Sequence, residues 1–141
     1  MREHWARRQR VDYLIVDEAQ FLTVGQVEQL VALVDDSHVD VYAFGLATDF
    51  RSRLFPGSGR LFELADVITA LQVEALCWCG RLAQFNARVR GETVLTEGEQ
   101  VLIADTEAGA AELRYQVLCR RHYRSGDLGS GRSDPEQLRL T

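Results

Sequence analysis

The chain has 141 residues, a formal net charge of -5 and a hydrophobic fraction of 46%, which suits one globular domain or one domain with a small appendage. The acidic balance argues against a general nucleic-acid-binding surface, which needs a basic face. No apolar run approaches the roughly 20 residues of a membrane span, and the charged start of the chain is unlike a signal peptide. We therefore expect a cytosolic protein that binds neither nucleic acid nor a membrane.

The first half of the sequence predicts a β-α-β unit. Residues 11–16 (VDYLIV) form a short apolar run that is typical of a buried strand. A helix begins at Thr23, with apolar residues on one face over 24–34, and Gln26 completes a capping box with Thr23. Residues 39–46 (VDVYAFGL) predict a second strand. This order indicates an α/β core with a parallel sheet.

The sequence changes character after a second helix, which we expect to open at Ser58 and Gly59. Beyond this helix, strand-like pieces alternate with glycines, as in a small β-ribbon. The small and acidic residues of segment 104–114 predict a loop. The strand-like pieces are residues 69–76, 83–89, 93–95 and 100–103.

Every cysteine of the chain lies in one of two short couplets. Cys77 and Cys79 form the first, and Cys119 with His122 forms the second. Structural Zn²⁺ sites take four N or S ligands, so these four residues predict a closed structural site with no open position for catalysis. Three cysteines in this arrangement fit a reducing compartment and a metal better than disulfides. The alternative is a set of buried free cysteines beside a surface histidine.

These features divide the chain into three parts. Residues 1–70 form the partial α/β core, residues 71–123 form the zinc-ribbon unit, and residues 124–141 form a disordered tail. The tail is assigned on its Gly, Ser, Arg and Asp content.

An Asp-Glu pair stands at the carboxyl end of the first predicted strand, as in a Walker B motif. In that motif Asp17 holds Mg²⁺, and Glu18 takes a proton from an attacking hydroxyl or water. Both side chains reach the ligand crevice at the end of a parallel strand. The alternative is that Asp17 and Glu18 only cap the following turn. The string DEAQ also occurs in helicase-type ATPases, but those motors need two large lobes and this chain is too short for them.

Five segments of the chain follow one another in a distinctive order: LIVDEAQFL, FGLATDFRSRLFPGS, LCWCGRLAQFNAR, GEQVLI and YQVLCRRHY. Together they resemble the thymidine kinase family of the cytosolic, zinc-containing type II, and the resemblance covers residues 11–123. It implies a RecA-like P-loop kinase core, here partial, with a small zinc-ribbon lasso domain. It also implies a homotetramer that transfers the γ-phosphate of ATP to the 5′-hydroxyl of thymidine, a salvage step in DNA precursor synthesis.

The same resemblance implies a role for each site residue. Asp17 would organise Mg²⁺ with ATP, and Glu18 would be the general base on the 5′-hydroxyl. Asn86 would lie near the thymine methyl group. The implied zinc ligands are Cys77, Cys79, Cys119 and His122. The apolar residues implied to enclose the nucleoside are Phe21, Leu46, Phe50 and Phe55. The residues that match the lasso over the base are Leu102, Ile103 and Tyr115.

The chain departs from the family in lacking the glycine-rich sequence GxxxxGK[ST], whose backbone and Lys hold the phosphates of ATP. It therefore looks like an N-terminally truncated member, and we expect it to be inactive alone. The alternative function is a non-catalytic zinc-ribbon remnant that acts as a binding or assembly module, with the missing N-terminal segment as its partner. The sequence does not decide between thymidine and deoxyuridine.

Overall fold

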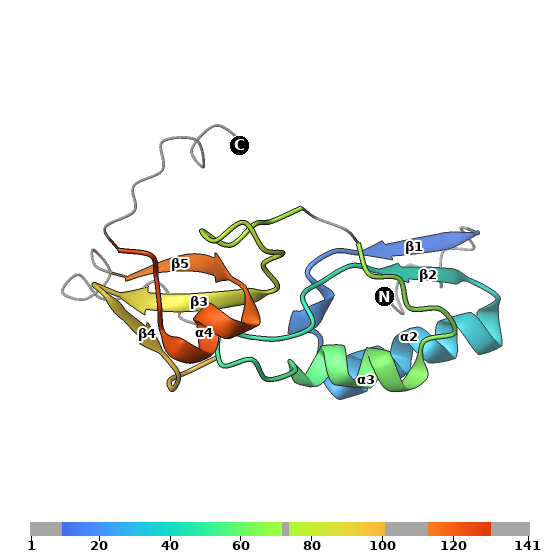
Figure 1. The fold of residues 1–141 in the computed structure, drawn as a ribbon. Helices are drawn as coiled ribbons and strands as arrows, with labels where there is room; N and C mark the ends of the chain where they lie inside the picture. The colour runs from blue at the N-terminus through green and yellow to red at the C-terminus, as the bar shows by residue number, and fades with distance from the viewer. Residues whose placement is uncertain (1–9, 72–73, 101–112, 131–141) are drawn as a thin grey trace. The chain divides into compact units, whose positions relative to one another are not determined.

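The computed structural model describes residues 10–71, 74–100 and 113–130. These residues form a mixed α/β structure with one parallel and one antiparallel sheet (Figure 1). They divide into two compact units: unit 1 runs to Ala47 and includes Leu54–Thr69, and unit 2 contains Thr48–Arg53 and continues from Ala70. The later division between the units falls between Thr69 and Ala70, and the segment Thr48–Arg53 belongs to unit 2 although it lies within the first half of the sequence. No helix among the described residues is long and apolar enough to cross a membrane.

Unit 1 contains the predicted β-α-β unit. Strands β1 (Tyr13–Val16) and β2 (Asp40–Ala43) pair in parallel, and helix α2 (Val24–Ser37) connects them. Both strands are shorter than the apolar runs over 11–16 and 39–46 that predicted them. The predicted α/β core with a parallel sheet is confirmed for these elements.

Helix α2 begins at the predicted residue because its first turn is capped from both sides. The Thr23 Oγ1 accepts a hydrogen bond from the Gln26 backbone N–H at 3.1 Å. The Gln26 Oε1 in turn accepts one from the Thr23 backbone N–H at 2.9 Å. This reciprocal pair satisfies two N–H groups that a helix start leaves unpaired, so the predicted capping box is confirmed.

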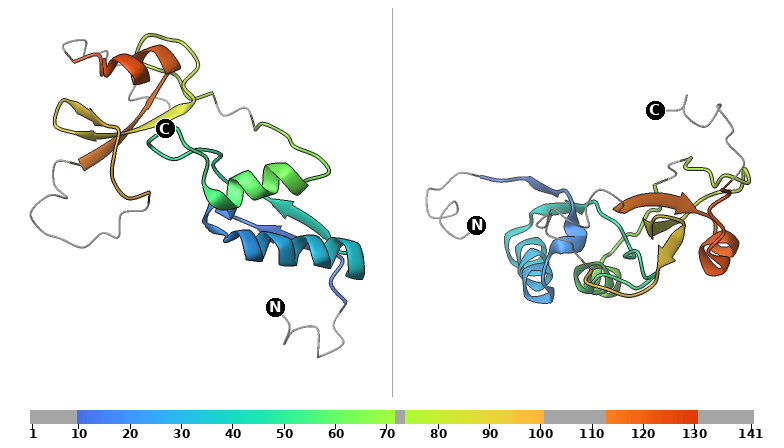
Figure 2. Two further views of the ribbon diagram at one scale, coloured as in Figure 1. Left: turned by 90° about the horizontal axis from the view of Figure 1, so that it is seen from below. Right: turned by 90° about the vertical axis from the view of Figure 1, so that its left-hand side faces the viewer.

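Two further elements complete unit 1: the short 3-10 helix η1 (Ala19–Phe21) and helix α3 (Pro56–Leu64). Helix α3 begins two residues before the predicted Ser58, with Pro56 in its first turn, where a missing N–H has no cost. Helices α2 and α3 lie side by side beneath the β1–β2 pair (Figure 1, Figure 2).

Unit 2 is built on an antiparallel sheet of strand order β4-β3-β5, followed by helix α4 (Arg120–Ser125). The strands are β3 (Phe85–Arg90), β4 (Thr93–Leu95) and β5 (Leu113–Leu118). Strands β3 and β4 match predicted pieces, whereas β5 and α4 were not predicted. The loop prediction over 104–114 was wrong for Leu113 and Arg114, which pair with β3 as the start of β5.

The strand-like piece over 69–76 does not form a strand in its described residues. Its one described pairing is an isolated antiparallel bridge between Leu76 and Leu82. Within the part of unit 2 that the structure describes, that piece has no neighbouring strand to bond with, and apolar alternation alone does not make a ladder. Of the piece over 100–103, residues 101–103 lie outside the described residues, as do residues 104–112 of the predicted loop.

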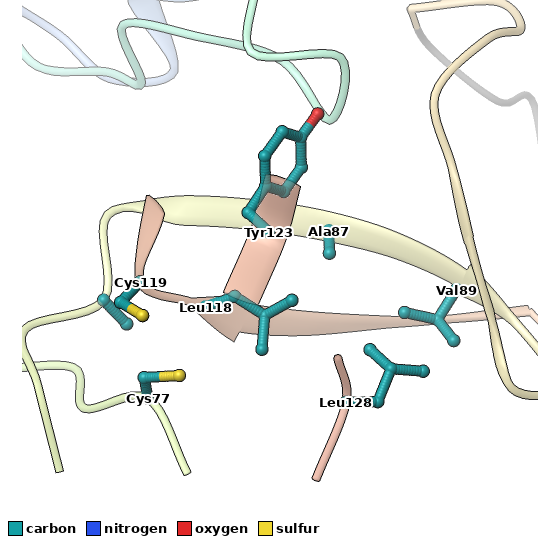
Figure 3. Close-up of a cluster of buried hydrophobic side chains, with 8 residues drawn as sticks. Cys77, Ala87, Val89, Leu118, Cys119, Tyr123 and Leu128 are labelled. Atoms are coloured by element: carbon teal, nitrogen blue, oxygen red, sulfur yellow. The ribbon is translucent and has the colours of Figure 1, made fainter. Parts of the chain in front are cut away.

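The core of unit 2 lies between its sheet, α4 and the end of the described chain. Figure 3 shows Ala87 and Val89 of β3 facing Leu118 of β5, with Tyr123 of α4 and Leu128 beside them. All five are buried. The ordered part of unit 2 thus extends beyond residue 123, where the sequence predicts that a tail begins, and 131–141 lie outside the described residues.

Candidate functional site

The predicted carboxylate pair lies directly after β1. Asp17 and Glu18 are both exposed to solvent. Glu18 adopts a left-handed conformation (φ 52°, ψ 40°), and its backbone N–H donates to the Asp17 Oδ1 at 2.8 Å. The Asp17 carboxylate thus bonds to the backbone of the next residue, while both carboxylates remain exposed at the carboxyl end of the strand.

The Glu18 side chain is held by a residue that the sequence interpretation did not single out. The buried Gln20 (3% exposed) donates its side-chain N–H to the Glu18 Oε2 and accepts, through Oε1, the Leu46 backbone N–H at 3.1 Å. Gly45 makes room for this amide, because a Cβ there would lie 2.5 Å from the Gln20 Oε1. The structure thus brings the carboxylate turn and the loop after β2 together around Gln20.

Three predicted nucleoside contacts also belong to unit 1. Phe21 is 56% exposed and meets the buried Phe55 edge to face, with 5.8 Å between the ring centroids and 85° between the planes. Leu46 is exposed, and its carbonyl accepts a hydrogen bond from the Ser58 Oγ at 2.6 Å. An exposed aromatic ring seated on a buried one offers an apolar surface to a flat base.

The remaining described nucleoside contacts, Phe50, Asn86 and Tyr115, belong to unit 2. The register of β3 and β5 pairs Arg88 with Tyr115 and Asn86 with Val117. Side chains two residues apart share a face of a strand, so Asn86, Arg88 and Tyr115 lie on one face. The other predicted lasso residues, Leu102 and Ile103, lie outside the described residues.

Arg88 is the centre of that face and was also missed in the sequence. It is only 3% exposed, and its guanidinium carbon lies 3.6 Å from the centroid of the Phe50 ring. The Arg88 Nε donates to the Tyr115 Oη at 3.0 Å. Its terminal nitrogens donate to the carbonyls of Glu99 at 2.8 Å and Gln100 at 3.3 Å. Arg88 therefore fixes Phe50 and Tyr115 relative to each other.

Asp49 anchors the same part of unit 2 from the turn that carries Phe50. Its carboxylate accepts hydrogen bonds from the Arg51 side chain at 2.7 and 3.0 Å, from the backbone N–H of Arg53 at 3.1 Å, and from the Gln100 amide at 2.9 Å. Burial alone would raise the pKa of Asp49. The hydrogen bonds from Arg51, Arg53 and Gln100 outweigh it and hold the pKa below its usual value.

The two metal couplets come together in unit 2. The ligand atoms of Cys77, Cys79, Cys119 and His122 all lie within 4.8 Å of one another. The Cys79 and Cys119 Sγ atoms are 4.0 Å apart, and the His122 Nδ1 lies 3.4 Å from the Cys77 Sγ and 3.5 Å from the Cys119 Sγ. Figure 3 shows the sulfurs of Cys77 and Cys119 close together at one end of the core cluster.

These separations fit a zinc ion. With Zn–S bonds of about 2.3 Å and Zn–N bonds of about 2.0–2.1 Å, the edges of a tetrahedron are about 3.8 Å between sulfurs and about 3.6 Å between sulfur and nitrogen. Of the six edges, one sulfur–sulfur edge is 4.0 Å, two sulfur–nitrogen edges are 3.4 and 3.5 Å, and none is longer than 4.8 Å. The cluster could therefore hold a zinc ion with all four positions filled by the protein.

The pKa values of the two buried thiols, Cys77 and Cys119, are shifted in opposite directions. A hydrogen bond from the backbone N–H of His122 lowers the pKa of Cys119, which favours the thiolate that binds metal. Burial raises the pKa of the Cys77 thiol. A cation at the centre would offset that burial penalty, since it would stabilise the charged form.

Comparison with known protein families identifies the family of this chain. The family model described as thymidine kinase matches residues 2–123. The chain belongs to the thymidine kinase family. Among curated thymidine kinases, that of Streptomyces avermitilis is 61% identical over 115 residues, which cover 82% of this chain and 53% of the relative. That of Streptomyces coelicolor is 57% identical over 122 residues, covering 86% and 56%.

A more distant thymidine kinase, from Cutibacterium acnes, is 52% identical over 124 residues, covering 88% of this chain and 57% of the relative. The chain thus spans about half the length of the curated thymidine kinases that it matches. The family match also removes the helicase-type interpretation of the DEAQ string.

The sequence contains a local indication that Gln20 and Arg88 belong to the candidate site. Gln20 belongs to the DEAQ string itself, and Arg88 stands two residues after Asn86 in a predicted strand, so the two share a face. What the sequence did not contain was their burial, which depends on partners 26 residues away for Gln20 and 27 for Arg88.

Proposed function

We propose that this chain carries the base and the Mg²⁺ carboxylate of a thymidine kinase, which transfers the γ-phosphate of ATP to the 5′-hydroxyl of thymidine. The observation that supports this most directly is the pair Asp17 and Glu18 at the carboxyl end of β1, with Glu18 held by Gln20. The chain contains no GxxxxGK[ST] sequence, so the proposal does not assign it the phosphate cradle.

Asp17 is the proposed Mg²⁺ carboxylate. Because Asp17 is exposed, its carboxylate is accessible to Mg²⁺. In such sites Mg²⁺ is usually bound by one or two carboxylates together with phosphate oxygens of the substrate. Glu18 is the proposed general base. The amide of Gln20 fixes one carboxylate oxygen, so the carboxylate has a defined direction toward a substrate hydroxyl.

The nucleoside contacts are proposed in each unit separately. In unit 1, the exposed ring of Phe21 on Phe55, together with Leu46, suits the apolar faces of a base. In unit 2, the proposal keeps Asn86 and Tyr115 in the roles implied by the family. Phe50 is buried beneath Arg88, so we propose that it supports that face instead of touching the nucleoside.

The finer family properties belong to the same proposal. We infer a RecA-like core for unit 1 and a structural zinc ion in unit 2, held by Cys77, Cys79, Cys119 and His122. The proposal is supported by the gathering of one nitrogen and three sulfur ligand atoms within 4.8 Å of one another. A cytoplasmic homotetramer is proposed on the family resemblance.

The proposal is tested in a hybrid enzyme. The segment of the Streptomyces avermitilis thymidine kinase that this chain matches is replaced by the corresponding residues of this chain. Purified hybrid is assayed with radiolabelled thymidine, ATP and Mg²⁺ beside the unmodified relative. We expect turnover in the range of about 1–100 s⁻¹ that is typical of kinases.

A folded, zinc-containing hybrid without thymidine phosphorylation would overturn the kinase proposal. That outcome would favour the alternative, in which this chain is a binding or assembly module. The 141-residue chain alone is the matched negative control, and we expect no turnover from it.

A further inference from the structure

An aromatic side chain covers the histidine of the metal cluster. The indole of Trp78 stacks on the imidazole of His122, with 4.2 Å between the ring centroids and 16° between the planes. The Nδ1 edge of the same imidazole faces the sulfurs of Cys77 and Cys119, at 3.4 and 3.5 Å. Trp78 lies between the two cysteines of the first couplet, so the stack joins one couplet to the other.

The position of the indole is itself fixed. The Trp78 Nε1–H donates to the Asp127 carbonyl at 3.0 Å, and the Asp127 backbone N–H donates to the His122 carbonyl at 3.1 Å. The chain then passes so close to the indole that a Cβ on Gly129 would lie 2.7 Å from its ring. Trp78 is therefore held by the turn after α4 while it covers His122.

Trp78 also packs against the core cluster of unit 2, but it remains half-buried, whereas Val89 and Leu118 are fully buried. The stack on the metal-cluster histidine is what distinguishes it from Phe85, which packs against the same core. The second torsion of a histidine side chain is broad, so an imidazole needs an outside contact to keep one nitrogen on a metal. That contact is usually a hydrogen bond to the other nitrogen. Within the described residues, the stacked indole of Trp78 is the contact that constrains the ring plane.

We propose that Trp78 is a positioning residue of the metal centre, which holds the imidazole of His122 with Nδ1 as the metal-binding atom. This inference rests on the proposed zinc site. It goes beyond that site in assigning a role to Trp78, and to Gly129 as the residue that lets the indole approach. Removal of a hydrogen-bonded outer partner typically changes metal affinity by about 10–100-fold, and we expect the loss of the stack to have an effect at the lower end of that range.

The first test compares two aromatic-to-aliphatic variants of the 141-residue chain. Zinc affinity is measured by competition with a chelator of known affinity, and unfolding of the metal-free form is measured beside it. Trp78→Leu should lower zinc affinity about 10-fold or more, and Trp78→Phe should restore most of the loss. Phe85→Leu is the control, because Phe85 stacks on Tyr123 in the same core, at 5.0 Å and 23°, and not on a ligand.

The second test keeps tryptophan at position 78 and displaces its indole by a substitution elsewhere. Gly129→Ala drives a methyl group into the indole, whereas Gly126→Ala has an almost equal positive φ (72° against 70°) and nothing within 4 Å of the new Cβ. The two substitutions therefore share the backbone penalty. Gly129→Ala should lower zinc affinity further than Gly126→Ala, and it should change the d–d absorption bands of the Co²⁺-substituted protein.

The outcomes separate the two proposals. Equal zinc affinity for Trp78→Leu and Phe85→Leu, after correction for their stability, would overturn the role of Trp78 while leaving the zinc site intact. Unchanged Co²⁺ bands in both Trp78→Leu and Gly129→Ala would do the same. A parent chain that is folded but binds neither Zn²⁺ nor Co²⁺ would instead remove the proposed zinc site, and the positioning role with it.

Discussion

The buried amide of Gln20 ties the carboxylate turn to the loop after β2. It can do so only because residue 45 has no side chain. A buried amide that loses its partners leaves unpaired polar groups at a cost of about 1–3 kcal/mol each. The geometry of Glu18 thus depends on a glycine at a distant position in the sequence.

Substitution of Gly45 should show this dependence. Gly45→Ala places a Cβ 2.5 Å from the Gln20 Oε1 and 2.9 Å from its backbone nitrogen. We expect a loss of about 1–3 kcal/mol in the free energy of unfolding, as for other overpacked sites. Gly59→Ala is the control, because Gly59 lies inside helix α3 and its new Cβ would lie 3.9 Å from the Leu54 Cδ1, an ordinary contact distance. We expect that substitution to be neutral or stabilising. Urea unfolding followed by circular dichroism measures both, and equal effects would contradict the account.

Asp49 predicts a pH dependence of stability. Its hydrogen bonds hold the folded-state pKa below the usual value, so its contribution is present above the unfolded pKa of about 3.9. It is lost as the pH falls through the folded pKa. Asp49→Asn should therefore be less stable than the parent at pH 7, and the gap should narrow on acidification to pH 3. The control is the exposed Asp66→Asn, for which the pH profile should follow the parent. A gap that stays constant between pH 7 and pH 3 would count against this role.

At the scale of elements, helix α2 owes its defined start to its capping box. Thr23→Ala removes the oxygen that accepts the Gln26 backbone N–H, and we expect a loss of about 1 kcal/mol in the free energy of unfolding. Thr23→Ser keeps the oxygen and should retain most of the stability. If the two variants unfold at the same denaturant concentration, the cap contributes little.

The capping box also explains why the first half of the fold could be predicted. The signals for α2 lie within four residues of each other, and the two strands beside it are continuous apolar runs. Local chemistry determines such elements. The segment over 69–76 also has strand-like apolar residues, but among the described residues its one strand pairing is the bridge between Leu76 and Leu82. Strand formation there depends on the rest of the fold and not on the pattern.

Unit 2 was harder to predict because its elements are joined by distant contacts. Strand β5 pairs with β3 over its whole length, although a segment of more than 20 residues separates the two in the chain. Leu128 is buried against that sheet, although it stands in a stretch rich in Gly, Ser and Asp. Residue types and their spacing in the sequence indicated the metal couplets and the candidate carboxylates. They could not indicate the buried Arg88, whose partners are set by tertiary structure.

At the scale of the whole molecule, the two units should respond differently to loss of metal. The ligands of unit 2 extend its small core, and a structural zinc ion provides folding free energy directly. Purified protein should contain about one zinc ion per chain. Removal by a chelator, or Cys119→Ser, should abolish the dispersed NMR signals of unit 2 and leave those of unit 1.

The matched control is His38→Asn. This histidine ends helix α2 in a left-handed conformation that asparagine also tolerates, and it lies outside the metal cluster. Zinc content should be unchanged in this variant. A metal-free chain with an intact unit 2 would contradict a structural role for zinc.

The central claim is that the carboxyl end of β1 carries the base of a thymidine kinase. The most direct measurement is the kcat of the hybrid enzyme with Glu18 and with Glu18→Gln, at saturating ATP, Mg²⁺ and thymidine. The substitution keeps the shape and a hydrogen-bonding oxygen but removes the base. We predict that kcat falls by about 10²–10⁴-fold while the thymidine Kd changes little. A Gln variant that turns over at nearly the parental rate would contradict the claim.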